Sequence, residues 1–298
     1  MKLSSGIERG VTCERAHSSA LVSPCRPSSG AQCVRRAGGW CVRGVRSVWE
    51  VVAMSSIQDV LEGRARWAVI HGDNKVVLPT LPDKGVAHMI TDPPYSDWTH
   101  GNSRIGASNS ADGFHRAADL GFAALTNEHA IAVASHAKRC AARWALFFTD
   151  LEGIGRWMDA GDDAGLKRAQ VGIWWKRGAA PAFSGLKPAC GAEAIVIRHG
   201  ESAMGWNGGG SHALFDHPIV TGSSRERLEH TTQKPMSLML ELVELFTDPD
   251  DLVLDPFCGS GTTGVACLRL GRRFIGLELS EKYAAVAQER MEAESKGL

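Results

Sequence analysis

The tetrapeptide Asp92-Pro93-Pro94-Tyr95 brings a carboxylate, bare carbonyl groups and an aromatic ring together in four positions. It follows directly on the apolar run Ala87–Thr91, which predicts a buried strand. The two prolines lack backbone N–H groups and restrict the chain, so their carbonyl oxygens remain as acceptors. At the carboxyl end of a strand in an open α/β sheet, such a group lies where ligands usually bind.

This set of acceptors suits an exocyclic amino group of adenine or cytosine. Such a nitrogen is a poor nucleophile because its lone pair is delocalised into the ring. If the Asp92 carboxylate and the Pro93 carbonyl each accept one amino hydrogen, the lone pair is turned toward an incoming methyl group. Tyr95 can stack on a base that has been flipped out of a duplex. Taken by itself, however, the tetrapeptide also fits a plain structural turn.

A glycine turn forms a second motif, between a buried strand at Leu252–Leu254 and a helix that starts near Thr262. Its glycines satisfy G-x-G-x-x-G at positions 259, 261 and 264, and Glu278 follows about 20 residues on, where an acid suits a ribose hydroxyl pair. The pattern fits both a nicotinamide dinucleotide and S-adenosylmethionine, since each carries an adenosine ribose. Only 34 residues follow Gly264, which disfavours a dehydrogenase whose second half comes after the turn.

In their order, these motifs resemble those of the amino-group DNA methyltransferases of the β arrangement. In that family the catalytic tetrapeptide precedes the target-recognition region, and the cofactor turn comes last. The resemblance runs from Arg66 to the C-terminus. The segment His230-Thr231-Thr232-Gln233-Lys234-Pro235 resembles the family's H-x-x-Q-K-P element along the cofactor, and His71-Gly72-Asp73 resembles its G-D element.

The resemblance implies a site-specific methyltransferase that uses S-adenosylmethionine, with no metal, and double-stranded DNA as substrate. The aspartate at the head of the tetrapeptide favours adenine N6, although its hydrogen-bond logic serves cytosine N4 equally. The motifs are also compatible with an RNA or protein-amide methyltransferase, and with a catalytically silent DNA-binding relative. The implied catalytic residues are Asp92, Pro93, Pro94 and Tyr95. The implied cofactor residues are Asp73, Lys234, Pro235, Asp255, Phe257, Gly259, Ser260, Gly261, Thr262 and Glu278.

Alternating strand and helix signals predict how these motifs are held. The expected fold is a doubly wound, mostly parallel seven-stranded sheet, of the class I S-adenosylmethionine-dependent methyltransferase type with a circularly permuted motif order. The predicted strands are Trp67–His71, Ala87–Thr91, Trp144–Phe148, Val171–Trp175, Ala194–Ile197, Leu252–Leu254 and Arg273–Leu277. The predicted helices are Ala117–Arg139, Pro235–Thr247, Thr262–Leu270 and Ser280–Ala293, with Ser280 as an N-cap.

Basic and aromatic residues between the catalytic and cofactor motifs predict contacts with DNA. Target-recognition loops are expected around 96–116 and 178–230. The candidate DNA-binding residues are Lys176, Arg177, Lys187, Arg198, Trp206, Arg225 and Arg227. The family resemblance also admits a cognate restriction endonuclease and a homodimer as partners.

Charge divides the chain into two unlike parts. Residues 1–53 hold eight Lys or Arg against three acids, whereas residues 54–298 hold 25 against 30, so positive charge for DNA must be concentrated in a cleft. We expect residues 1–53 to be a disordered extension, or sequence translated upstream of a true start at Met54, and residues 54–298 to be the catalytic domain. Scattered cysteines and the lack of a long apolar run predict a cytoplasmic protein with reduced thiols and no membrane span.

Overall fold

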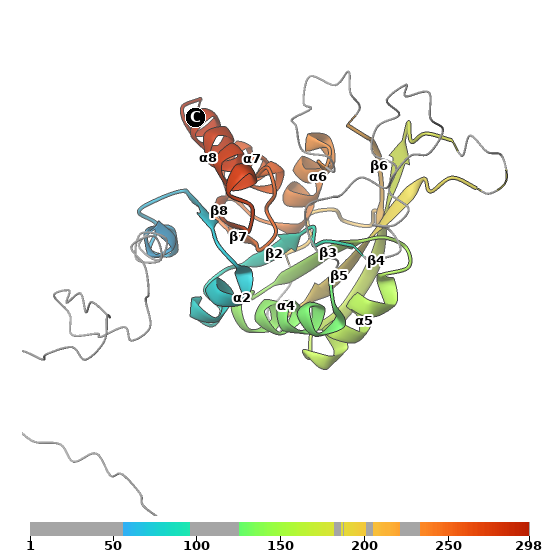
Figure 1. Cartoon of the computed structure of the whole chain (residues 1–298), viewed down its shortest axis with the longest axis horizontal. Helices are drawn as coiled ribbons and strands as arrows, with labels where there is room; N and C mark the ends of the chain where they lie inside the picture. The colour runs from blue at the N-terminus through green and yellow to red at the C-terminus, as the bar shows by residue number, and fades with distance from the viewer. Residues whose placement is uncertain are drawn as a thin grey trace, which may run out of the picture. The chain divides into compact units, whose positions relative to one another are not determined.

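A mixed sheet of eight strands forms the centre of the described structure (Figure 1). The computed structural model describes residues 56–95, 125–181, 186, 188–200, 205–220 and 233–297. The predictions for residues 1–53 and for the loop at 96–116 lie outside the described residues. The strands are β1 (Trp67–His71), β2 (His88–Thr91), β3 (Trp144–Thr149), β4 (Lys167–Arg177), β5 (Ala192–His199), β6 (Leu214–Pro218), β7 (Leu252–Asp255) and β8 (Arg273–Glu278).

The strand order is β1-β8-β7-β2-β3-β5-β4-β6. All neighbouring strands are parallel except for the pairs β3–β5 and β5–β4, which are antiparallel. All seven predicted strands are present, so the mostly parallel sheet is confirmed. The prediction of seven strands was one short, because β6 lies in a segment that we expected to be a loop. In β6 only Phe215 is buried, and a short, polar edge strand gives little apolar signal.

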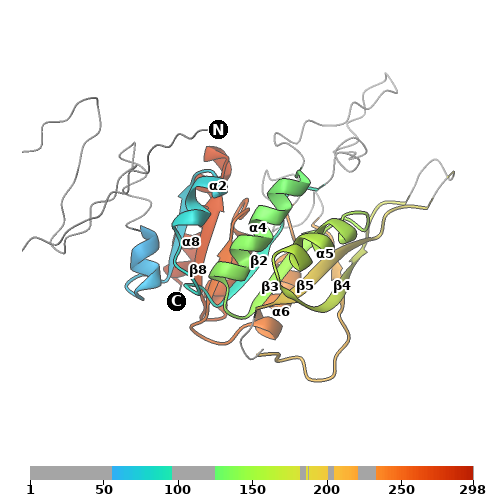
Figure 2. The same ribbon diagram turned by 90° about the horizontal axis from the view of Figure 1, so that it is seen from below.

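Helices cover both faces of the sheet, as the doubly wound prediction requires. The helices are α2 (Asn74–Val77), η1 (Leu78–Thr80), α4 (Asn127–Cys140), α5 (Ile154–Asp163), α6 (Met236–Phe246), α7 (Thr262–Arg269) and α8 (Glu281–Ser295). Figure 2 looks onto the face that α2, α4 and α5 cover, and α6, α7 and α8 lie on the other face (Figures 1 and 2). None of the helices formed by the described residues has the length and apolarity that a membrane span requires.

Each face of the sheet packs its own apolar core. Met89 and Phe147 point toward α4 and α5, while their neighbours Ile90 and Leu146 point toward α6 and α7. The two cores explain why the central strands are apolar on consecutive residues: strand side chains alternate between faces, and here both faces are covered.

Helix boundaries follow local capping. Thr126 caps α4 by accepting from the His129 N–H, so the helix starts later than the predicted Ala117, and residues 117–124 lie outside the described part. Ser280 caps α8 through the Tyr283 N–H, as predicted. Pro235 is the extended residue before α6 and not its first helical residue. The helix α5 was missed, since glycines at 155 and 161 weaken its helical signal.

The direction of the strands brings the predicted motifs to one edge of the sheet. Strands β1, β8, β7, β2, β3, β4 and β6 all end there, whereas β5 begins there. Residues that follow β1, β2 and β8 therefore meet those that open β5. We call this side of the sheet the carboxyl edge.

Candidate active site

Oppositely charged side chains meet beside the tetrapeptide at the carboxyl edge. Lys234, just before α6, places its Nζ 2.6 Å from Asp92 Oδ2, 3.0 Å from the Tyr95 hydroxyl and 3.2 Å from Glu193 Oε2. The Tyr95 hydroxyl donates to Glu193 Oε2 at 2.7 Å. On the other side, Lys176 Nζ lies 2.5 Å from Glu193 Oε1. Two acids and two lysines thus balance in charge around one tyrosine.

Asp92 has one oxygen held by the protein and one left over. Its Oδ2 accepts from Lys234, whereas its Oδ1 is buried and has no hydrogen-bond partner among the described residues. Burial raises the pKa of the Asp92 carboxyl, Lys234 lowers it and Glu193 raises it again, with a net increase over the ordinary value. A buried acceptor without a partner is costly, so Oδ1 is available to a donor that the described residues do not supply.

Glu193 is a member of this site that we did not predict from the sequence. It opens β5, in register with Trp174 of β4, and is 8% exposed. Burial raises the pKa of its carboxyl, but Lys234 and Lys176 outweigh that effect, and the net pKa is lowered. The available signal was an acid at the start of an otherwise apolar strand, where a buried charge needs a partner.

Lys234 and Lys176 lie elsewhere than we expected. The resemblance assigned Lys234 to the cofactor, but its ammonium group binds Asp92, Tyr95 and Glu193. Burial lowers the pKa of Lys234, whereas Asp92 and Glu193 raise it by more, so the ammonium stays protonated. Lys176, predicted to contact DNA, is paired with Glu193 and 20% exposed. Both lysines therefore belong to the charge network of the tetrapeptide.

The glycine turn connects β7 to α7 at the next position along the edge. Gly259 and Gly261 have φ values of 52° and 80°, a conformation that favours glycine. Gly264 has a packing role, because a Cβ there would lie 2.7 Å from Met291 Sδ and 2.7 Å from the Phe274 ring. The glycines thus let the chain turn tightly at the carboxyl edge before α7 begins.

Glu278 ends β8 directly beside this turn. Its carboxylate accepts from the Gly259 N–H at 2.9 Å and from the Ser280 N–H at 2.8 Å. Burial raises the pKa of Glu278, and these backbone donors lower it, with a net increase. A carboxylate beside a glycine turn fits the ribose hydroxyl pair of an adenosine ligand.

Asp255 joins β2, the strand before the tetrapeptide, to the glycine turn. Its Oδ1 accepts from the Thr91 hydroxyl at 2.7 Å and from the Phe257 N–H at 3.1 Å, and its Oδ2 accepts from the Thr263 hydroxyl at 2.8 Å. The carboxyl is 2% exposed, and burial raises its pKa to about 7, although the two threonines oppose the shift. Both carboxylate oxygens of Asp255 are therefore bonded within the protein and hold the glycine turn against β2, and a contact with the cofactor stays a prediction.

The pKa of Asp255 predicts a pH-dependent stability. Because the folded pKa lies above that of the unfolded chain, protonation stabilises the fold, and this stabilisation is lost as the pH rises from about 4 to 7. In Asp255→Asn the amide mimics the protonated acid. We expect the difference in unfolding free energy between wild type and variant to change by up to about 1.4 kcal/mol per pH unit in that window. Urea unfolding at pH 5, 6, 7 and 8 measures it.

The matched control is Asp250→Asn, which removes a carboxylate that is 78% exposed. Asp250 has a φ of 65°, a conformation that asparagine tolerates. Wild type and Asp255→Asn changing in parallel with pH would contradict the prediction.

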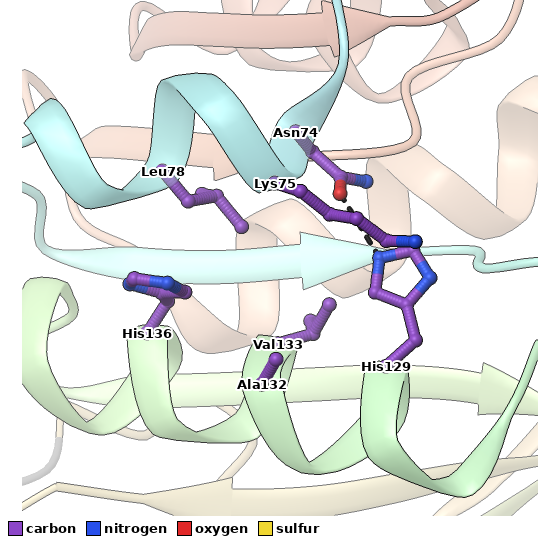
Figure 3. A pocket seen from close by; sticks show the side chains of 7 residues that line it. All are labelled: Asn74, Lys75, Leu78, His129, Ala132, Val133 and His136. Carbon is purple, nitrogen blue, oxygen red and sulfur yellow. Dashed lines mark hydrogen bonds between the residues drawn. The ribbon is translucent and has the colours of Figure 1, made fainter.

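A small cavity lies between α2 and α4, close to the cofactor turn (Figure 3). Asn74 lines this cavity. Its Nδ2 donates to the Pro256 carbonyl at 3.0 Å, and its Oδ1 lies 3.0 Å from His129 Nε2. His129 also packs against the Phe257 ring, with centroids 5.6 Å apart. Asp73 caps α2 by accepting from the Lys75 N–H. These contacts tie the G-D element to the turn.

One of the predicted DNA contacts, Arg198, is wrong. Arg198 is 0% exposed, and its guanidinium binds Asp162 and the Met158 carbonyl under α5, where a Cβ on Gly161 would collide with it. Trp206 packs on Phe246 and donates to the Gly209 carbonyl, in the segment between β5 and β6 at the opposite edge of the sheet. A basic residue type does not reveal burial, which explains the error at Arg198. Trp206 is half-buried, and its contact with DNA stays a prediction.

Of the other candidates, Arg177 is exposed at the end of β4 and paired with Asp216. Lys187, Arg225 and Arg227 lie outside the described residues. The expected recognition region 178–230 contains β5, the strand predicted at Ala194–Ile197, and also β6, which was not predicted. In the part of the chain that the structure describes, no three His, Cys, Asp or Glu side chains are grouped to hold a metal ion.

Comparisons with known proteins agree with this geometry. Residues 173–289 match the DNA methylase family of N6 and N4 enzymes. The methylase candidate YubD of Escherichia coli (strain K12) is 28% identical over 75% of this chain and 89% of its own length. The type II methyltransferase M2.DpnII of Streptococcus pneumoniae is 46% identical over 82 residues, which are 26% of this chain and 31% of that protein.

Solved structures share the fold. The M1.HpyAVI–SAM complex superposes with a TM-score of 0.58 at 23% identity, covering 76% of this chain and 98% of that one. The cytosine-N4-specific PvuII DNA methyltransferase gives a TM-score of 0.57 at 14% identity, covering 78% and 91%. Together with the motifs at the carboxyl edge, these matches show that residues 173–289 are similar to DNA methylases of the N6 and N4 type, and that the chain has the fold of S-adenosylmethionine-dependent DNA methyltransferases.

Proposed function

We propose that the chain transfers a methyl group to N6 of adenine at a specific sequence in double-stranded DNA. The observation that carries the proposal is the buried Oδ1 of Asp92 at the head of the tetrapeptide, which has no hydrogen-bond partner among the described residues. It supplies the acceptor that an amino hydrogen requires. The preference for adenine over cytosine rests on the aspartate itself, which the family resemblance associates with N6.

Asp92 and Pro93 orient the amino group. Asp92 Oδ1 accepts one hydrogen and the Pro93 carbonyl accepts the other, which turns the nitrogen lone pair out of conjugation with the ring. Lys234 holds Oδ2 at 2.6 Å, so the carboxylate keeps its charge and its orientation. The Tyr95 ring, fixed through its hydroxyl, stacks on the extruded base.

The residues around the glycine turn fit S-adenosylmethionine. Glu278 would hold the ribose hydroxyls, the turn at 259–262 would lie against the ligand, and Asp73 and Phe257 would lie toward its adenine. When bound, the cofactor supplies a methyl group on a sulfonium, which is transferred by direct displacement. As the nitrogen–carbon bond forms, Asp92 Oδ1 takes the amino proton. The protein contributes positioning and hydrogen bonding.

Product analysis tests the proposal. The protein is incubated with labelled S-adenosylmethionine and unmethylated duplex DNA, and the DNA is digested to nucleosides. Label in N6-methyldeoxyadenosine is expected. Label in N4-methyldeoxycytidine would overturn the assignment of the base, label only in RNA would overturn that of the nucleic acid, and no transfer despite cofactor binding would indicate a silent DNA-binding relative.

An exposed tryptophan near the carboxyl edge predicts a DNA contact. Trp175 is 52% exposed at the end of β4, in register with Ala192, the neighbour of Glu193. Stacking of a base on an aromatic ring contributes about 1–3 kcal/mol, so Trp175→Ala should weaken duplex binding by about tenfold or more and leave cofactor affinity unchanged. Fluorescence anisotropy with labelled duplex at fixed salt measures the loss.

Leu214→Ala is the matched control. Leu214 is 61% exposed and also apolar, but it begins β6 at the opposite edge of the sheet. Equal losses for the two variants would contradict a local contact at Trp175. A partner restriction endonuclease, a homodimer and a cytoplasmic location stay predictions.

A further inference from the structure

Glu193 occupies the centre of the charge network beside the tetrapeptide. Its Oε2 accepts from the Tyr95 hydroxyl at 2.7 Å and lies 3.2 Å from Lys234 Nζ, while its Oε1 lies 2.5 Å from Lys176 Nζ. Each oxygen of the carboxylate therefore has a partner, and Oε2 contacts both Tyr95 and Lys234, the lysine that binds Asp92. It does not itself bond to Asp92.

We propose that Glu193 is a positioning residue for methyl transfer, which holds the Tyr95 ring and the Lys234 ammonium in place and balances the charge at Asp92. The proposal rests on the role of the tetrapeptide in transfer. Without Glu193, Lys234 has one acid in place of two, and the tyrosine hydroxyl loses its acceptor. The Tyr95 hydroxyl would then be held through Lys234 Nζ, 3.0 Å away, without its bond to a carboxylate, and the network would carry one excess positive charge.

Glu193 acts on Asp92 through its charge as well as through the contacts that hold Tyr95 and Lys234. Lys234 Nζ lies 5.2 Å from the centroid of the Tyr95 ring and 5.2 Å from that of Phe148, in a buried site where charges are poorly screened. The charged and titratable groups around Asp92 are Lys234, Tyr95, Glu193, Lys176 and Asp255. Since Glu193 raises the pKa of Asp92 and Lys234 lowers it, the two have opposite effects on how readily Asp92 ionises.

The pH dependence of transfer tests the charge role. Transfer needs ionised Asp92, so the single-turnover rate falls as the pH drops through the pKa of Asp92. In Glu193→Gln the amide oxygen can still accept from Tyr95, but the negative charge is gone. We expect the acid limb of the rate profile to move down by about one pH unit, with a plateau rate within about threefold of wild type.

Lys176→Gln is the matched variant, since it removes the opposite charge from the same ion pair. Its acid limb should move up, and the double variant Glu193→Gln/Lys176→Gln should return close to wild type. Glu193→Ala, which also loses the contact with Tyr95, should lower the plateau about tenfold or more. The same series is repeated with Asp255→Asn, so that the titration of the nearby Asp255 carboxyl cannot be mistaken for that of Asp92.

The assay uses the full chain with saturating S-adenosylmethionine and a duplex containing a site that the wild type modifies. Rates are corrected for the active fraction, measured by cofactor-binding stoichiometry, so misfolding cannot imitate a shift. An acid limb that stays in place or moves up in Glu193→Gln overturns the proposal. Failure of the wild type to methylate adenine would instead refute the proposed function, so the two failures are distinguishable.

Discussion

Asp92→Ala is expected to lower the single-turnover rate of methyl transfer by about a thousandfold. The variant removes the acceptor for an amino hydrogen and the group that takes the proton, and a positioned acid–base group contributes about 10²–10⁴-fold. Cofactor affinity should change by less than about twofold, because the residues at the glycine turn are untouched. Single-turnover assays with labelled cofactor, together with calorimetric cofactor binding, measure the two quantities.

Asp92→Asn should fall between wild type and alanine, since its amide oxygen can accept a hydrogen without carrying the charge. Asp83→Asn is the control. Asp83 is 78% exposed, pairs with Arg139, and lies before the start of β2, at the opposite end of the strand from Asp92. If Asp92→Ala transferred methyl groups at the wild-type rate, the catalytic assignment would be wrong.

Lys234→Met is expected to destabilise the fold and to shift the pH profile of transfer upward. The variant leaves Asp92 and Glu193 buried together without the cation between them, and breaking a buried pair in this way costs about 3–5 kcal/mol. Because the folded pKa of Asp92 rises further, stability should fall as the pH increases and recover at acid pH. Urea unfolding at pH 6 and pH 8 and the acid limb of the transfer rate measure both effects.

Two further variants sharpen this prediction. Lys234→Arg keeps the charge and should restore most of the stability. Lys176→Met removes a more exposed partner of Glu193 and should cost less. Equal stability of Lys234→Met and wild type at pH 8 would contradict a buried ionic network.

The fold was largely predictable from the sequence because its central strands are apolar on consecutive residues. This signal located β1, β2, β3, β7 and β8 to within one residue at each end. It failed where burial and residue type diverge: β6 exposes most of its side chains, and α5 contains glycines that accommodate Arg198.

The site was predictable where chemistry is local in sequence. The tetrapeptide and the glycine turn are contiguous motifs, so the structure brings together what the pattern indicated. Glu193 is not contiguous with either, and only the antiparallel direction of β5 brings it beside Tyr95. Conversely, arginine is a residue type suited to DNA contact, but Arg198 is buried and its charge is paired with Asp162.

The placement of β7 has a consequence for how the protein is made. β7 pairs with β2 in the middle of the sheet, yet 160 residues, 92–251, separate the two strands in the chain. At about 5–20 residues per second, the ribosome needs about 8–30 s to supply the partner of β2. During synthesis an apolar strand edge waits unpaired, which favours chaperone binding and slows folding through long-range contacts. The glycine turn directly follows β7, so it too is made long after the tetrapeptide.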